Sequence, residues 1–356
     1  MERQSARSYG LWMGELPPGL HNDITDVPGV LVGHVSLIKG YGPLVPGMGP
    51  VRTGITAIRP HPGNIYREPC WAGIHVINGF GKSLGIPYIQ ETGLLNSPIL
   101  LTNTLSVYDA AQGMLTYLLQ ENPEIGHDAR TPNLVVFECD DTYLNDIRGR
   151  HVKPWDGILA LNRAAAGPIV QGSVGAGVGM SLFQLKGGIG SASRTVPIND
   201  KEYRVGMLAL TNFGQLEDML INGVPIGLMM KRMNHDEILC QVPGSLILVG
   251  VTNAPLSRRQ LEMLAARASL GLGRTGGISR MGSGDFCLMV NNNGLELKNP
   301  ISDWELDPFF KAVVEITAES IWNSMFYATS MEGRDGHVRK ALPIEEVLCW
   351  MGLISP

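Results

Sequence analysis

The chain has 356 residues, enough for one large domain or two ordinary ones with substantial cores. Its 28 lysines and arginines against 33 acidic residues give a formal charge of −5 with no basic block, so neither nucleic acid nor an anionic membrane is expected as a partner. Charged residues make up only 17%, below the roughly 25% of an average soluble chain, which suggests surface buried by thick layering or by subunit contacts.

The cysteines and the first residues of the chain predict the cellular compartment of the protein. The five cysteines are odd in number and form no C-x-x-C pair, so we expect a reducing environment and no disulfide framework for Cys70, Cys139, Cys240, Cys287 and Cys349. The polar start MERQSARSYG and the two prolines at 17 and 18 offer no secretory signal, so the protein is expected to begin near Met1 and to stay in the cytoplasm. The uncharged stretch 164–185 contains five glycines and is expected to form a buried strand with a glycine-rich turn, not a membrane span.

Apolar segments predict many strands and fewer helices. Several segments are apolar on both faces, which calls for sheets covered on both sides; the predicted strands are residues 29–35, 54–58, 99–102, 134–138, 169–174, 204–210, 246–251 and 285–291. Helices are predicted at 105–121, after a Ser257 cap, and across 307–331. Because strands and helices do not alternate strictly, we expect a layered α/β sandwich in one continuous domain over residues 1–356.

The familiar catalytic motifs are missing from the sequence. There is no H-E-x-x-H, no G-x-x-x-x-G-K-[ST] and no G-x-S-x-G, and the eight histidines do not cluster at ligand spacing. We therefore expect neither a metal nor another cofactor. What remains is a set of polar residues at the ends of apolar strands.

The sharpest of these features is Gly244-Ser245, directly before the apolar run 246–251. The Ser245 hydroxyl could attack the Gly244 carbonyl, move the acyl group from nitrogen to oxygen and lose it to water. The product would begin with a serine whose α-amine, with a pKa of about 7.7 to 8.0, can act as general base for its own hydroxyl. Gly-Ser occurs four times in the chain, however, and is usually turn chemistry.

Two other strand ends carry candidate partners. Asn212 follows the apolar residues 207–210 and could donate an N–H to a developing oxyanion, or it could simply cap a turn. Ser283 and Asp285 lie two apart at the start of a strand, so their side chains point the same way. They could orient the Ser245 amine together, or they could only close a hairpin.

A third strand end carries carboxylates. Glu138 ends a strand and is followed by Asp140 and Asp141. Such a cluster could hold a substrate ammonium group. More often a carboxylate cluster of this kind is a solvated loop.

Taken together, these segments resemble the family of L-aminopeptidase/D-esterases and β-aminopeptidases, serine hydrolases that mature by autoproteolysis. The resemblance covers almost the whole chain, through GLHNDITDVPGVLVGH, ILLTNTLSV, ECDDTYLNDIRG, QGSVGAGVGM, TNFG, PGSLILVGVTNAPL, LGLGRTGG, MGSGDF and MEGRDGHVRKALP in that order. It implies a four-layer α/β/β/α sandwich, similar to that of N-terminal-nucleophile hydrolases but differently connected. It also implies a homo-oligomer of processed heterodimers.

The resemblance also implies roles for single residues. Ser245 would be the nucleophile and new N-terminus, Asn212 an oxyanion donor, and Ser283 and Asp285 the partners of the nucleophile and its amine. Glu138 would lie near the substrate amino group. Some members have Glu at the position of Asp285, and some place a tyrosine after the Glu138 position as a second oxyanion donor, where the nearest tyrosine here is 143.

The expected function is thus an autoprocessed aminopeptidase that acts on short peptides, amides or esters with a free amine, through an acyl-enzyme on Ser245. Cleavage between Gly244 and Ser245 would divide the chain into 1–244 and 245–356. Two alternatives stay open. One is an uncleaved, non-catalytic oligomeric protein that binds a small molecule; the other is an acyltransferase that uses the same nucleophile.

Overall fold

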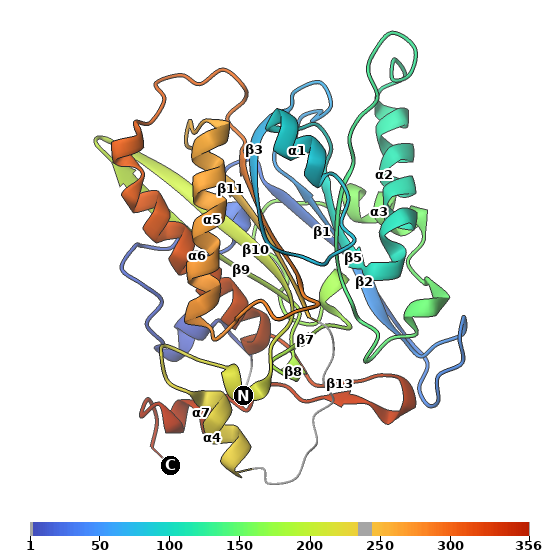
Figure 1. Ribbon diagram of the computed structural model, residues 1–356, viewed down its shortest axis with the longest axis vertical. Helices are drawn as coiled ribbons and strands as arrows, with labels where there is room; N and C mark the ends of the chain where they lie inside the picture. The colour runs from blue at the N-terminus through green and yellow to red at the C-terminus, as the bar shows by residue number, and fades with distance from the viewer. Residues whose placement is uncertain (1–2, 234–243, 356) are drawn as a thin grey trace.

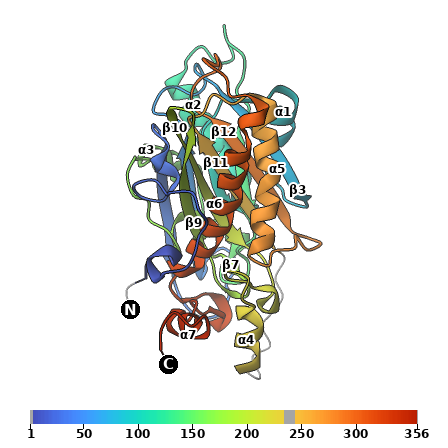
Figure 2. The ribbon, with the colours of Figure 1, turned by 90° about the vertical axis from the view of Figure 1, so that its left-hand side faces the viewer.

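The computed structural model describes residues 3–233 and 244–355. Its strands form two large sheets that lie face to face, and each sheet carries helices on its outer face (Figure 1). Figure 2 views the same layers from the side, with α5 and α6 toward the viewer. The arrangement is a layered α/β sandwich, as the sequence pattern predicts, and has the four α/β/β/α layers that the family resemblance implies.

The first sheet has four strands in the order β1-β2-β5-β6. The β1–β2 and β2–β5 pairs are antiparallel and the β5–β6 pair is parallel; the bounds are β1 Leu31–Lys39, β2 Val51–Arg59, β5 Ile99–Asn103 and β6 Val135–Cys139. Its outer face packs against α2 (Val107–Glu121) and α3 (Pro154–Asn162) through a core that includes Ile55, Leu100 and Met114.

The second sheet has six strands in the order β4-β3-β12-β11-β10-β9. The β11–β12 pair is parallel and the other four neighbouring pairs are antiparallel; the bounds are β3 Cys70–Gly79, β4 Leu94–Leu95, β9 Ile189–Ile198, β10 Lys201–Asn212, β11 Ser245–Thr252 and β12 Gly284–Asn291. Its outer face is covered by α5 (Arg258–Arg274) and α6 (Asp307–Phe326). The smaller elements are α1 Ile86–Thr92, α4 Ile226–Met233, α7 Ile344–Trp350, β7 Ser181–Leu182, β8 Leu185–Lys186, β13 Met331–Glu332 and β14 Val338–Arg339.

The inner core between the sheets explains why the central strands are apolar on both faces. Along β11, Ile247, Val249 and Val251 point into this core, and Leu246 and Leu248 point to the helix side. Phe137 of the first sheet stacks on Phe286 of the second with ring centroids 6.3 Å apart. A strand between two apolar layers has no solvent face, so its sequence shows no polar alternation.

The structure agrees with seven of the eight predicted strands. The prediction of a strand at 169–174 is wrong, because Pro168 and the positive-φ glycines Gly167, Gly172 and Gly175 interrupt the extended backbone there. The predicted helix 307–331 ends at Phe326. Across residues 3–233 and 244–355, no helix combines the length and apolar character that a bilayer crossing would need.

A close contact between β9 and α6 offers a test of the layering. A Cβ built on Gly190 would lie 1.9 Å from the Ser320 carbonyl oxygen and 2.5 Å from the Ser324 nitrogen, both of them backbone atoms. We expect Gly190→Ala to push the helix from the sheet and to lower the free energy of unfolding by about 1 to 3 kcal/mol. Thermal unfolding followed by circular dichroism measures the change.

The control is Gly273→Ala, in α5, where nothing lies within 4 Å of the added carbon. Alanine is the better helix former by about 1 kcal/mol, so this variant should melt at or above the wild-type temperature. Equal melting temperatures for the two variants would contradict the close packing of β9 on α6.

Candidate active site

The N-terminal end of β11 lies between two strands that bring the predicted residues to it. Ser245 pairs with Asn212 of β10 in antiparallel register and with Gly284 of β12 in parallel register. Ser245 is buried, with 5% of its surface exposed. Strand pairing therefore places Ser245 beside the end of one neighbour and the beginning of the other, next to Ser283 and Asp285.

The peptide bond before Ser245 is held by two hydrogen bonds to one oxygen. The Ser245 hydroxyl donates to the Gly244 carbonyl oxygen at 2.7 Å, and the Gly284 N–H donates to the same oxygen at 3.3 Å. Donors on a carbonyl oxygen withdraw charge and make its carbon easier to attack. A Cβ on Gly244 would lie 3.1 Å from the Phe213 Cβ and 3.2 Å from the Ser283 Oγ, so the site favours glycine at this position.

Ser283 and Asp285 face each other as their spacing predicts. The Ser283 hydroxyl donates to Asp285 Oδ1 at 2.6 Å, and both side chains are buried. Burial raises the pKa of Asp285, and hydrogen bonds from Ser283, Ser279 and the Leu246 backbone oppose this rise. Asp285 is paired with Leu246 across the β11–β12 ladder, so this carboxyl lies one residue along from the nucleophile candidate.

Asn212 is held at both ends of its carboxamide. Its Oδ1 accepts from the Ser181 backbone N–H at 2.8 Å, and its Nδ2 donates to the Asp140 carbonyl at 2.7 Å. An amide nitrogen carries two N–H groups. Only one of them is used within the part of the chain that the structure describes, so the other can serve a substrate oxygen.

A buried charged layer, formed by Arg339, Lys186 and Asp141, lies behind Asn212 and was not predicted from the sequence. Arg339 Nε donates to Ser181 Oγ at 2.9 Å, and Lys186 Nζ donates to the carbonyls of Gly177 and Met180 at 2.9 Å each. Burial lowers the pKa of Lys186 to about 7 and raises that of Asp141 to about 8. A lone lysine directly after 22 uncharged residues was the sequence signal for this layer.

Glu138 reaches the same region from the first sheet. Its Oε1 accepts from the Lys82 backbone N–H at 2.8 Å, and its Oε2 accepts from the Thr104 hydroxyl. A Cβ on Gly81 would be 3.4 Å from Glu138 Oε1, and a Cβ on Gly284 would be 2.5 Å from the Gly81 Cα. Gly81 therefore lies between the Glu138 carboxylate and Gly284, the first residue of β12.

The carboxylate cluster around Glu138 does not form as one group. Asp140 Oδ1 accepts from the Thr142 N–H at 2.8 Å, and Asp141 Oδ1 accepts from Asn145 Nδ2 at 2.9 Å. Each of the three carboxylates has different hydrogen-bond partners, so they do not act as one cluster. Nowhere in 3–233 or 244–355 do three His, Cys, Asp or Glu side chains converge as metal ligands would.

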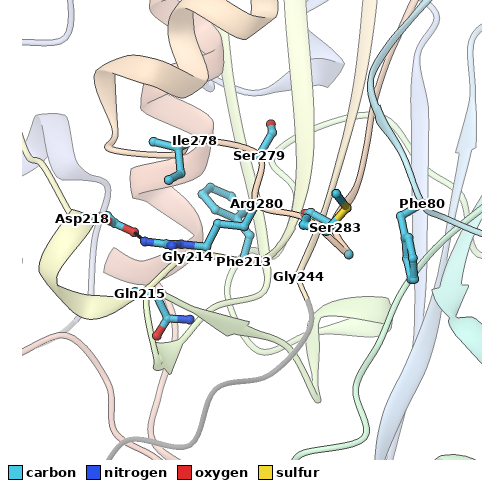
Figure 3. Close-up of a pocket in the computed structure, with 12 residues that line it drawn as sticks. Phe80, Phe213, Gly214, Gln215, Asp218, Gly244, Ile278, Ser279, Arg280 and Ser283 are labelled. Carbon is cyan, nitrogen blue, oxygen red and sulfur yellow. Dashed lines mark hydrogen bonds and ion pairs between the residues drawn. The ribbon is translucent and has the colours of Figure 1, made fainter.

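A pocket of about 350 Å³ opens beside this junction (Figure 3). Gly244 and Ser283 lie near its middle, Phe80 at one end, and the ion pair between Arg280 and Asp218 at the other. The remaining lining residues are Phe213, Gly214, Gln215, Ile278, Ser279, Met281 and Gly282. This pocket could not be predicted from the sequence, because its walls come from four separate segments of the chain.

Comparison with known proteins identifies the family. A profile of peptidase family S58 matches residues 22–339. Beta-peptidyl aminopeptidase BapA of Sphingosinicella microcystinivorans is 36% identical over 356 aligned residues, which cover 93% of this chain and 87% of the relative. The crystal structure of the PH0078 protein from Pyrococcus horikoshii OT3 superimposes with a TM-score of 0.92 at 48% identity, over 97% of this chain and 98% of that one.

A second solved structure bears on the fold. The L-aminopeptidase D-Ala-esterase/amidase of Ochrobactrum anthropi superimposes with a TM-score of 0.90 at 32% identity, over 99% of both chains. Its structure is described as a prototype for the serine aminopeptidases and as a new variant among the Ntn hydrolase fold. The family predicted from the sequence motifs is confirmed: the chain belongs to peptidase family S58 and is a serine aminopeptidase with an Ntn-hydrolase-like α/β/β/α fold.

Proposed function

We propose that the protein cleaves its own Gly244–Ser245 bond and then acts as an N-terminal serine aminopeptidase on short peptides, amides or esters with a free amine. The observation that carries the proposal is the Gly244 carbonyl, which accepts from Ser245 and Gly284 where Asn212 and the Ser283–Asp285 pair gather. Residues 1–356 would fold as one α/β/β/α unit and remain one unit after cleavage into 1–244 and 245–356.

Self-cleavage is an acyl shift followed by hydrolysis. The Ser245 oxygen bonds to the Gly244 carbonyl carbon, the C–N bond breaks, and the hydroxyl proton ends on the departing nitrogen. Water then adds to the resulting ester, which leaves a Gly244 carboxylate and a free Ser245 amine and hydroxyl. The Gly284 N–H supports the negative charge that develops on the carbonyl oxygen in the first step.

The mature enzyme repeats this chemistry on a substrate. The Ser245 amine takes the proton from its own hydroxyl, and the hydroxyl oxygen attacks the substrate carbonyl. An Asn212 N–H stabilises the oxyanion, and the Ser283–Asp285 pair holds the protonated amine. The substrate C–N or C–O bond then breaks, the Ser245 ammonium gives its proton to the leaving group, and the acyl group stays on Ser245. Glu138, buried and already bonded to Lys82 and Thr104, receives the substrate ammonium group. Water then frees the acyl group from Ser245.

Two alternative functions, an uncleaved binding protein and an acyltransferase, agree with the observations to different degrees. Membership of a peptidase family speaks against an uncleaved binding protein. An acyltransferase would pass the same Ser245 acyl group to an amine instead of water, and product analysis with an added amine separates the two reactions.

We also infer the setting in which the enzyme works. Cys70, Cys139 and Cys287 are free and buried and Cys349 is free, which supports a reducing cytoplasm; Cys240 lies outside the described residues. Large exposed apolar side chains such as Trp155 and Tyr108 support an oligomer of processed heterodimers. The formal charge of −5 supports partners other than nucleic acid or membrane.

Substitution of Ser245 tests self-cleavage. We expect the wild-type protein to give fragments of about 26 kDa and about 12 kDa, in proportion to 244 and 112 of the 356 residues of a 38.5 kDa chain. Ser245→Ala should remain full length because it has no nucleophile, and Ser245→Cys should be cleaved. A denaturing gel of each purified protein shows the outcome, and cleavage of Ser245→Ala at the wild-type rate would refute the mechanism.

Substitution of Glu138 separates substrate binding from self-cleavage. Glu138→Gln keeps the shape of the side chain but removes the charge, so kcat/KM for an aminoacyl p-nitroanilide should fall by about 10- to 100-fold, mostly through KM. Self-cleavage needs no ammonium group and should proceed as in the wild type. Glu124→Gln, in an exposed ion pair with Arg67, is the matched control. An unchanged KM in Glu138→Gln would show that the ammonium binds elsewhere.

The Asp285 carboxyl should add a second, lower step to the acid side of the pH profile. The Ser245 amine must be neutral to act as a base, so kcat/KM should first fall as the pH drops through the amine pKa, whose reference value is about 7.7 to 8.0. Burial raises the pKa of Asp285 above its usual value, so this carboxyl gains a proton sooner as the pH falls, and kcat/KM should fall again at lower pH. In kcat/KM measured against pH, Asp285→Asn should have low activity and show the amine step alone. A lower step that survives in Asp285→Asn would assign it to another group.

A further inference from the structure

We propose that the pocket beside Ser283 binds the leaving group of the substrate and that Arg280 recognises its terminal carboxylate. This inference rests on the proposed function and names a substrate class for it: short peptides with both a free amine and a free carboxylate.

The charged groups lie on opposite sides of the scissile bond. Phe80 lines one end of the pocket, and the next residue, Gly81, lies against Glu138 and against the start of β12. Gly244 and Ser283 follow in the middle, and Arg280 and Asp218 lie at the far end (Figure 3). Glu138 and Arg280 therefore flank the reaction centre, one with negative and the other with positive charge.

This order fixes the direction of a bound peptide. With the ammonium group at Glu138 and the reacting carbonyl at Ser245, the chain can continue only away from Glu138. The part beyond the scissile bond then lies along the pocket toward Arg280. In a short peptide this part ends in a carboxylate, which a guanidinium group binds through two parallel hydrogen bonds.

Arg280 is held in place and still has donors to offer. Its Nη2 donates to Asp218 Oδ2 at 2.6 Å, and its side chain remains 46% exposed. A guanidinium group has several N–H donors, and Asp218 engages one nitrogen, so a second carboxylate can bind the others. Asp218 thus orients the Arg280 guanidinium group, and it also competes with a substrate carboxylate for binding to that group.

The backbone around Arg280 is fixed as well. The Arg280 carbonyl oxygen accepts from Asn78 Nδ2 at 2.9 Å, which ties this loop to the end of β3. Ser279 has a φ of 49°, in the left-handed region that a non-glycine residue adopts only where its surroundings impose it. A loop with these restraints can hold its arginine at a set distance from the nucleophile.

The pocket walls limit the size and polarity of a leaving group that lies between Ser245 and Arg280. Phe80, Phe213, Ile278 and Met281 supply apolar surface, which favours an apolar side chain on the leaving residue. The volume of about 350 Å³ is near the small end of the roughly 300 to 1,000 Å³ found for small-molecule sites. We therefore infer a leaving group of one or two residues.

The test compares a dipeptide with its C-terminal amide. The first residue of the dipeptide is the one whose p-nitroanilide the enzyme cleaves best, and the second residue is phenylalanine. The readout is kcat/KM for the dipeptide with a free C-terminal carboxylate, divided by kcat/KM for the same dipeptide with a C-terminal amide. For the wild type we expect a ratio of about 10, since a hydrogen-bonded charge pair at a partly exposed site contributes about a factor of ten. Arg280→Gln should bring the ratio near 1, and Asp218→Asn should raise it by removing the competing carboxylate.

Arg67→Gln is the matched control, because Arg67 forms an exposed ion pair outside the residues that line the pocket, and its ratio should equal that of the wild type. A wild-type ratio near 1, or a ratio unaffected by Arg280→Gln, overturns the subsite while p-nitroanilide turnover by the wild type still supports the proposed function. A wild type that cleaves none of these substrates overturns both. If Arg280→Gln does not fold, inhibition of the wild type by 3-phenylpropanoate and by 3-phenylpropanamide decides, because neither compound has an amine for Glu138: equal inhibition overturns the subsite.

Discussion

The pairing of β11 between β10 and β12 is the constraint on which the site depends. It places Ser245 opposite Asn212 on one side and Gly284 on the other. A register slip of one residue would turn every side chain of β11 to the opposite face. The inner core resists such a slip because Ile247, Val249 and Val251 all face the other sheet, so burial of apolar surface fixes the position of the nucleophile candidate.

The charged layer behind Asn212 shows what the four-layer arrangement makes possible. Lys186 is fully buried, yet its Nζ donates hydrogen bonds to the carbonyl oxygens of Gly177, Met180 and Gly187. A buried charge costs much less when such acceptors surround it. Arg339 in this layer hydrogen-bonds to the Ser181 side chain, and the Ser181 N–H donates to the Asn212 carboxamide. Buried hydrogen bonds therefore fix the orientation of the proposed oxyanion donor.

Sequence reasoning succeeded where a local pattern sets the structure. Ser257 caps α5 as predicted and accepts from the Gln260 N–H, and the spacing of Ser283 and Asp285 places both side chains on one side of β12. It failed where contacts between distant segments decide. The Gly284 N–H is a backbone group without a side-chain signal. No strand was predicted for β9, whose residues are mostly small or polar, because its cover by α6 comes from a distant part of the chain. The pocket at Arg280 depends on strand order, which periodicity does not report.

Mass spectrometry of the intact protein and of its peptides, after brief reaction with a slowly hydrolysed aminoacyl ester, shows where the chain is cleaved and where it is acylated. We expect a fragment that begins Ser-Leu-Ile-Leu, with the added mass of one aminoacyl group on Ser245. Active protein that consists of an uncleaved chain, or that carries the acyl group on any other residue, would contradict it.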